Sequence, residues 1–457
     1  MKLSIVIPSY NSASGLKRSL HYLQRQQLPE GGALEVIVLD DGSSDDTAAT
    51  VEGFTGQVPG LQYVFQARDA RSCRSRARNL GAARATGEVL TFLDAGVLVG
   101  PTFVRQVLER YATGKRRVLL HHTHGLFASL EAAEKQELVD LTPDTFHAVL
   151  ARLREDLEWI EPREPFFELT GGELDRLPGA WALGWSVAFS VHRELFERVR
   201  GFDEEFLAWG DEDCDLTYRL GLEGGELWAE REAVALHWPH PRAPRSPRED
   251  EERLARRRYL HRKRHELETE LFLYTDNLFL PQAVGRFEQL VATYAQPLYP
   301  RDFLQALSAR LPERGRSLLV GMDHVWSARQ LRTSHLAVHS RGALASFRAA
   351  FPEREVLRTL CLDTPFEAGA FEVALVTDFV RLLGPTLQEA MVRELLRIAR
   401  NVWMVHAEGY TSFSQLYENQ HWASLDELRS VAGKAGGRLL PDGQHGSFHT
   451  FRLVSDR

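Results

Sequence analysis

The sequence predicts an α/β protein with a doubly wound parallel sheet, and three observations support this. Short apolar runs at Leu3 to Pro8 and Leu34 to Asp41 each lead into a polar loop and then into a helix-like pattern. A third apolar run, Val89 to Val99, has Asp94 and small residues at its centre. The alternation begins again after about residue 314, which predicts a second α/β domain.

The elements of the first half follow in order. Leu3 to Pro8 is expected to be a buried strand, and Gly15 to Gln27 a helix with leucines at helical spacing. The strand over Leu34 to Asp41 leads through a Gly-Ser turn into a helix that Ser44 or Asp45 caps. The elements expected after these are a strand at Leu61 to Phe65, a helix at 75–88, a strand that begins at Val89, a helix at Pro101 to Tyr111, a strand at Val118 to His124 and an inserted helical segment at about 126–179.

Composition limits the class of protein. The 457 residues, 44% hydrophobic and 26% charged, are typical of a globular chain of two or three domains. A net charge of -8 argues against nucleic acid as the main partner. Three scattered cysteines favour a reducing compartment, and no apolar run is long enough for a membrane span. We therefore expect a cytoplasmic protein, with peripheral membrane association left open.

The first half carries motifs in a characteristic order: IVIPSYN, then VLDDGSSDD, then ARNLGAARATGEVLTFLDAG. Together they resemble the nucleotide-sugar domain of family-two, GT-A-type inverting glycosyltransferases. A later segment, GWSVAFS followed by WGDEDCDL, resembles the carboxyl-terminal part of galactosyltransferase-like members. The resemblance implies a Rossmann-like GT-A catalytic domain over residues 1–245, followed by a helical linker over 246–313 and a smaller α/β domain over 314–457.

The resemblance implies a nucleotide site at the first two strand ends. The residues expected to line it are Pro8, Ser9, Tyr10, Asn11, Asp40, Asp41, Arg78 and Asn79. A carboxylate at a strand end, Asp41 or Asp40, can accept a hydrogen bond from N3 of a uracil ring. Arg78 would lie near the base or the phosphates, and Asn79 would support the loop. The alternative is that the two aspartates are purely structural and stabilise the following helix by placing negative charge at its amino terminus.

A metal site is implied at Asp94, where the family motif has a second acidic residue two positions later. Gly96 stands at that position here. A histidine after a later strand, His237 or His240, is expected to complete the shell around Mn²⁺ or Mg²⁺ together with the diphosphate.

The WGDEDCDL motif supplies the expected acceptor side. Asp213 is the candidate general base that takes the proton of an acceptor hydroxyl, and Glu212 is the next candidate. Trp209, with Gly210 beside it, would stack on a sugar face. The alternative for these acids is a charged helix start that needs no catalysis.

The second domain resembles a class I S-adenosylmethionine-dependent methyltransferase around TPFEAGAFEVALVTDFV. Its turn after SLLVGM has only Gly321 where a glycine-rich turn is needed, and His339 stands where an acidic residue normally binds the ribose. We expect a methyltransferase-like fold that does not bind the cofactor and that serves dimerisation, acceptor recognition or packing.

The resulting hypothesis is metal-assisted transfer of a sugar, most simply from a UDP-linked donor, to a hydroxyl of a glycan, lipid-linked or small-molecule acceptor, with a homodimer left open. Two alternatives stay open at this point: a nonenzymatic protein that binds sugar nucleotides or glycans, and a bifunctional glycosyltransferase and methyltransferase.

Overall fold

The computed structural model describes residues 1–134, 138, 140–154, 156–208, 210–240, 247–293, 298–407 and 423–456. They form two compact units, one of residues 1–256 and 277–281 and the other of residues 257–276 and 282–457. The residues that the sequence assigned to a separate helical linker, 246–313, are therefore shared between the two units. Among the described residues, no helix combines the length and the apolar character needed to cross a membrane.

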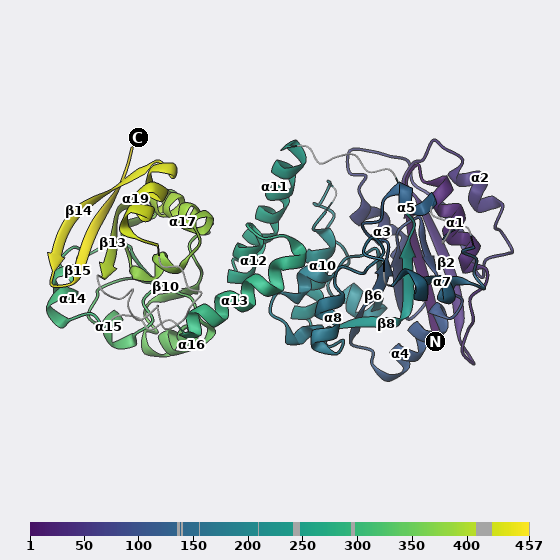
Figure 1. Ribbon diagram of the computed structural model, residues 1–457, viewed down its shortest axis with the longest axis horizontal. Coiled ribbons are helices and arrows are strands. Elements are labelled where there is room, and N and C mark those ends of the chain that lie inside the picture. The colour runs from purple at the N-terminus through teal and green to yellow at the C-terminus, as the bar shows by residue number, and fades with distance from the viewer. Residues whose placement is uncertain are drawn as a thin grey trace. The chain divides into compact units, whose positions relative to one another are not determined.

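The first unit contains an eight-stranded sheet (Figure 1). Its strands are β1 (Lys2–Ser9), β2 (Ala33–Asp40), β3 (Leu61–Phe65), β4 (Val89–Leu93), β5 (Val97–Val99), β6 (Arg117–His124), β7 (Ala188–His192) and β8 (Glu226–His237). Their order in the sheet is β3-β2-β1-β4-β7-β6-β8-β5. The first four run parallel, as predicted, but β7 is antiparallel to both β4 and β6, so the sheet as a whole is mixed.

Helices cover both faces of this sheet. They are α1 (Ala13–Leu23), α2 (Thr47–Glu52), α3 (Arg74–Arg84), α4 (Phe103–Thr113), α5 (Leu130–Glu134), α7 (Phe146–Leu153), α8 (Glu164–Thr170), α9 (Arg193–Arg198), α10 (Glu212–Leu222) and the 3₁₀ turns η1 (Leu174–Arg176), η2 (Ala180–Leu183) and η3 (Asn277–Phe279). Alternation along β1 decides the faces, because Ile5 packs in one core with Leu20 of α1, whereas Val6 faces Gly81 of α3. Figure 1 shows α1 and α3 on opposite sides of the strands.

The run Val89–Val99 does not form one continuous strand. It divides into β4, beside β1, and β5, which pairs with β8 at the far edge. The turn between them holds Asp94, and Gly96 in that turn has a φ of 101°, where residues other than glycine are strained. This conformation favours glycine over a second aspartate at the position two residues after Asp94.

The inserted segment after β6 is helical, as expected, and contributes to the core. Phe146 and Leu150 of α7 pack with Trp159 in a cluster that also includes Leu236 of β8. The ion pair between Glu161 and Arg163, at 2.9 Å, is completely buried. These contacts make the described part of this segment a structural layer of the first unit.

The second unit contains a seven-stranded sheet in the order β11-β10-β9-β12-β13-β15-β14. Its strands are β9 (Ser317–Val320), β10 (His335–Val338), β11 (Glu355–Arg358), β12 (Phe371–Val376), β13 (Ala399–Ala407), β14 (Gly437–His445) and β15 (Phe448–Ser455). The remaining helices of the chain, from residue 247 onwards, are α11 (Pro247–Arg264), α12 (Leu267–Phe272), α13 (Leu280–Thr293), α14 (Arg301–Ser308), α15 (Val325–Arg329), α16 (Arg341–Ala350), the 3₁₀ turn η4 (Asp378–Leu382), α17 (Pro385–Ile398) and α19 (Leu425–Lys434). The boundary between the units falls within α11 and within α13. The five strands from β11 to β13 are parallel, which confirms the predicted α/β character of this unit.

Candidate active site

The predicted site residues of the first unit follow the ends of strands that meet at one edge of its sheet. β1, β2, β4, β6 and β8 reach this edge with their carboxyl ends, and β7 reaches it with its amino end because it is antiparallel. In open α/β sheets, ligands bind outside the carboxyl ends of the strands. The register therefore supports a ligand site at this edge.

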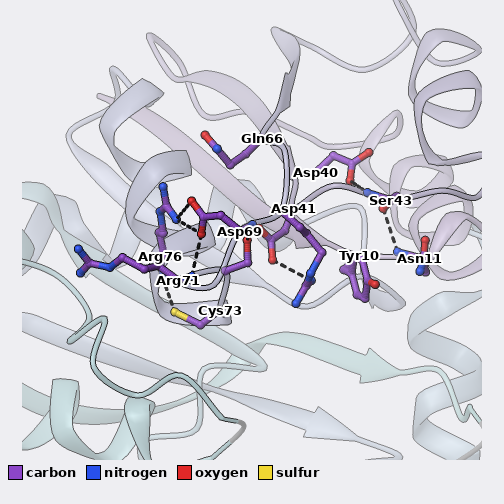
Figure 2. A network of polar contacts seen from close by, with 12 residues as sticks. Tyr10, Asn11, Asp40, Asp41, Ser43, Gln66, Asp69, Arg71, Cys73 and Arg76 are labelled. Carbon is purple, nitrogen blue, oxygen red and sulfur yellow. Dashed lines mark hydrogen bonds and ion pairs between the residues drawn. The ribbon is translucent and has the colours of Figure 1, made fainter.

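At the ends of β1 and β2, hydrogen bonds tie the two loops together. The backbone N–H of Asn11 donates to Ser43 Oγ at 2.9 Å, and the backbone N–H of Ser44 donates to Asn11 Oδ1 at 2.8 Å. Asn11 has a positive φ of 47°, which is tolerated better by asparagine than by most residues. Figure 2 shows Tyr10, Asn11 and Ser43 beside the two aspartates.

The two aspartates at the end of β2 have different environments. Asp40 is fully buried, and its two oxygens accept from the backbone N–H of Ser43 at 2.7 Å and from Tyr63 Oη at 2.7 Å. Asp41 accepts from Arg68 Nη1 at 3.0 Å, and burial raises the pKa of its carboxyl. Asp40 thus holds the loop with both oxygens, whereas Asp41 interacts with the side chains of Ser72 and Arg68, and that of Arg68 is 40% exposed.

An exposed aromatic side chain stands next to Asp41. Tyr10 is 47% exposed, and the Arg68 guanidinium lies 3.9 Å from the centre of its ring. The adjacent loop is stiffened by Asp69, which accepts two bonds from Arg76 at 2.7 and 2.9 Å (Figure 2). A flat ring, a carboxylate and a guanidinium, in the loops after β1, β2 and β3, can together accommodate a planar heterocycle.

Arg78 joins the two groups of acids that the sequence assigned to different roles. Its side chain is buried, and it donates to Asp94 Oδ1 at 2.9 Å and to Glu212 Oε1 at 3.1 Å. Burial lowers the pKa of Arg78, but Asp94, Glu212 and Asp213 more than offset this and the net shift is upward. One permanently charged guanidinium therefore holds the acid after β4 and the first residue of α10 at a single site.

Asn79 secures the loop that leads to α10. Its side-chain nitrogen donates to the carbonyl of Phe202 at 2.9 Å and to Glu204 Oε1 at 3.0 Å, and its oxygen accepts from the backbone N–H of Phe202 at 2.9 Å. These bonds of Asn79 thus support the loop before α10 rather than the residues at the ends of β1 and β2.

Asp213 lies at the start of α10, close to the residues that follow β4. Its Oδ2 accepts from the backbone N–H of Ser186 at 3.2 Å, while the carbonyl of the next residue, Val187, accepts from the backbone N–H of Asp94 at 3.1 Å. Two adjacent residues therefore connect Asp94 and Asp213. Burial and the neighbouring Glu212 raise the pKa of Asp213 to about 7, although Arg78 opposes the shift.

Glu212 is held in a fixed position. Its side chain is 4% exposed, and it accepts from Arg78 and from the backbone N–H of Gly210 at 2.9 Å. Gly210 has a φ of 109°, which requires glycine at this turn. Trp209 lies outside the described residues, so its expected stacking role stays a prediction.

The end of β8 brings the candidate histidines near the Asp94 turn. His237 pairs with Val97, and the backbone N–H of Trp238 donates to the carbonyl of Gly96 at 3.0 Å. His237 and His240 lie together, with ring centres 5.1 Å apart. Among the described residues, no group of three or more His, Cys, Asp or Glu side chains is arranged to hold a metal ion. Asp94, whose side chain is 30% exposed, and one histidine make up only part of a coordination shell.

Two aromatic residues at this edge were not identified from the sequence. Trp185 directly precedes Ser186, the partner of Asp213, and Phe127 lies in the turn after β6 with its ring centre 6.3 Å from that of Trp185. Phe127 is 64% exposed. The tryptophan of GWSVAFS could have been singled out as an aromatic residue next to a predicted strand. Its contact with Phe127 depends on strand order, which the sequence pattern does not show.

Comparison with known proteins agrees with the motifs. Residues 4–158 match the profile of "Glycosyl transferase family 2", and residues 180–237 match that of "N-terminal domain of galactosyltransferase". Both matched segments lie within the first unit. The two matched segments contain the nucleotide-side residues, the Arg78 network and the start of α10.

Two curated relatives are each similar to about half of this chain. The chain is 37% identical over 242 residues to validoxylamine A glucosyltransferase of Streptomyces hygroscopicus subsp. jinggangensis, covering 52% of this chain and 56% of the relative. It is 29% identical over 245 residues to chondroitin synthase of Escherichia coli, covering 52% of this chain and 35% of the relative. The chain thus spans about half of the first relative and a third of the second.

Proposed function

We propose that the first unit is a glycosyltransferase domain, which transfers a sugar from a nucleoside-diphosphate donor, UDP-linked in the first instance, to a hydroxyl acceptor with inversion at the anomeric carbon. The observation that carries this proposal is the Arg78 guanidinium, which binds both Asp94 and Glu212 and lies beside Asp213. Acids expected to serve the donor phosphates and the acceptor hydroxyl therefore belong to one site.

On the donor side, we assign base recognition to Asp41 rather than to Asp40. Asp40 uses its oxygens within the fold, whereas Asp41 can exchange the bond from Arg68 for a bond from N3 of uracil. The base would stack on the exposed ring of Tyr10, with Pro8, Ser9 and Asn11 supplying the wall of the site.

On the acceptor side, Asp213 is the proposed general base. The acceptor oxygen attacks the anomeric carbon, the bond from that carbon to the diphosphate oxygen breaks, the hydroxyl proton moves to Asp213, and the nucleoside diphosphate leaves. A carboxylate with a pKa of about 7 suits this step, because it accepts a proton better than an ordinary aspartate and is still ionised in a useful fraction at neutral pH. Glu212 and Arg78 position Asp213 by fixing the start of α10.

We further propose that Asp94 and one histidine of the 237–240 segment hold Mn²⁺ or Mg²⁺ jointly with the donor phosphates. The register between Val97 and His237 supports this assignment. The cation would stabilise negative charge on the departing diphosphate. Because the protein supplies only part of the shell, cation and nucleotide should bind together.

The experiment is nucleotide release from a panel of nucleotide sugars, measured with and without manganese for the wild type and for Asp213→Asn. Loss of turnover in Asp213→Asn with retained UDP binding supports the transferase. Tight nucleotide-sugar binding by the wild type with no turnover for any donor and acceptor would instead support the nonenzymatic binding protein. A matched control is Glu223→Gln, because Glu223 is an exposed acid at the other end of α10.

For the second unit, we propose a methyltransferase-like domain that does not hold S-adenosylmethionine. Its strand order reverses between β9 and β12, and a ligand would bind outside the carboxyl ends of these strands. There, a Cβ on Gly321 would meet Thr377 Oγ1 at 2.6 Å, and the rings of His339 and Phe379 stack at 3.7 Å. The chain's own side chains thus fill this position.

Calorimetry with S-adenosylmethionine tests this proposal. No heat of binding is expected up to millimolar ligand, whereas micromolar binding would support the bifunctional enzyme. We also propose a reducing, cytoplasmic environment, since the three cysteines are buried and none is in a disulfide.

A further inference from the structure

We propose that Trp185 and Phe127 form a platform for the acceptor, and that the acceptor presents a saturated six-membered polyol ring, a pyranoside or a cyclitol. This inference rests on the proposed transferase function and specifies the acceptor class for the same site. It depends on where the two rings lie, on how Trp185 is fixed and on the exposure of Phe127.

A continuous set of contacts places the two rings beside the proposed base. Asp94 bonds to Val187, and Ser186 bonds to Asp213, so the segment that begins with Trp185 lies between the two acids. On its other side, Trp185 contacts Phe127 in the turn after β6.

That turn also lies against the end of β8, which pairs with the strand after Asp94. A Cβ on Gly125, whose φ is 74°, would lie 2.8 Å from the carbonyl oxygen of His237. His237 in turn pairs with Val97. The turns after β4, β6 and β8 and the segment before β7 therefore surround one site, with the aromatic pair on the acceptor side.

The indole of Trp185 is held before any ligand binds. Its Nε1 donates to the carbonyl of Ala182 at 3.1 Å, and the Arg163 guanidinium lies 5.0 Å from its ring centre. Arg163 is itself fixed, because it bonds to Glu161 at 2.9 Å and to the carbonyl of Leu183 at 3.0 Å, with no exposed side-chain surface. A fixed ring loses little conformational entropy when a ligand packs on it.

Phe127 completes the platform on the solvent side. Its ring is 64% exposed and meets Trp185 at an interplanar angle of 64°. Trp185 packs partly on the core, so its presence alone has a structural explanation. Burial contributes little for Phe127 at this exposure. Its ring is instead available to a ligand, next to an indole that is fixed beside the proposed base.

A polyol ring matches this surface better than other hydroxyl acceptors. The axial C–H bonds of a pyranose or cyclitol form an apolar face that packs on aromatic rings, while its equatorial hydroxyls project from the rim. One of these hydroxyls can then point towards Asp213. A flexible lipid alcohol or the short side chain of a serine has no comparable rigid apolar face.

Phe127→Ala tests the platform, with Leu222→Ala as the matched control because Leu222 is also 64% exposed but lies at the end of α10 opposite to Asp213. Nucleotide release is measured for UDP-glucose and UDP-N-acetylglucosamine, both without acceptor and with methyl β-D-glucopyranoside, cellobiose or myo-inositol. We expect Phe127→Ala to raise the KM for the ring acceptors about two- to tenfold while leaving acceptor-independent hydrolysis unchanged. Leu222→Ala should change neither quantity.

Trp185→Phe is the second variant, since it keeps an aromatic ring but loses the bond to Ala182. An intermediate increase in acceptor KM with an unchanged donor KM supports the platform. Two outcomes overturn it: Phe127→Ala that leaves the KM of every ring acceptor unchanged, or efficient transfer only to a polyprenyl phosphate or a serine peptide. If the wild type neither hydrolyses nor transfers from any donor, the proposed function itself fails, which distinguishes the two failures.

Discussion

The rate of transfer is expected to depend on pH near neutrality because burial and Glu212 raise the pKa of Asp213 from 3.8 to about 7. If the ionised form is the base, about one-tenth of the free enzyme is active at pH 6 and about nine-tenths at pH 8. The value of kcat/KM should therefore rise about tenfold between these pH values. An aspartate with an ordinary pKa would be almost fully ionised at pH 6 and would give no such rise.

Continuous UDP release across pH 5 to 9 measures this dependence. Glu212→Gln removes the like charge and should move the acid limb to lower pH, because the remaining Arg78 favours ionised Asp213. Glu197→Gln, whose side chain is 62% exposed, is the matched control and should leave the limb in place. A flat profile down to pH 5, or a limb that Glu212→Gln leaves unmoved, would refute the assignment of Asp213 as the base.

The same pKa has a consequence for stability. A carboxyl whose pKa is raised in the folded state binds more protons there than in the unfolded state between about pH 4 and pH 7. The free energy of unfolding therefore falls as the pH rises through this window. The shift from 3.8 to about 7 sets an upper limit of about 4 kcal/mol for this decrease. Asp213→Asn should therefore be stabilised relative to the wild type at pH 8 but not at pH 4, as measured by urea unfolding.

Three further predictions concern the frame of the site. Glu161→Gln leaves Arg163 buried without its counter-ion and should lower the free energy of unfolding by about 3–5 kcal/mol in urea; a loss below about 1 kcal/mol would contradict a tight pair. Gly81→Ala places a Cβ 2.4 Å from Val6 Cγ1 and should lower the free energy of unfolding of the first unit by about 1–3 kcal/mol. Gly53→Ala should not, because the nearest atoms to its Cβ would lie at 3.5 Å or more, an ordinary van der Waals distance. Manganese alone should bind weakly in calorimetry and much more tightly with UDP present; equal affinity with and without UDP would argue for a complete protein site.

The sequence was sufficient to predict the elements that carry the local signals. Strand ends at Asp40 and Asp94 could be located because apolar β runs stop abruptly at polar turns, and β3 has the predicted bounds Leu61–Phe65. The antiparallel entry of β7 could not be predicted, since it depends on where the chain returns after the long insertion.

The candidate acids were predicted separately, but the link between them was not. Arg78 and Glu212 are separated by 134 positions in the chain, and no local pattern indicates that a buried arginine will join them. The same holds for Phe127 and Trp185. Motifs identify residue types at strand ends, whereas the pairing of these ends is set by sheet topology and by packing across the whole unit.

The most direct test of a single site shared by donor and acceptor chemistry is UDP binding by calorimetry to the wild type, Asp94→Asn and Asp213→Asn in the presence of manganese. We predict that Asp94→Asn weakens UDP binding and that Asp213→Asn preserves it, while both abolish sugar transfer. Unchanged binding in Asp94→Asn, or full transfer activity in Asp213→Asn, would contradict the account.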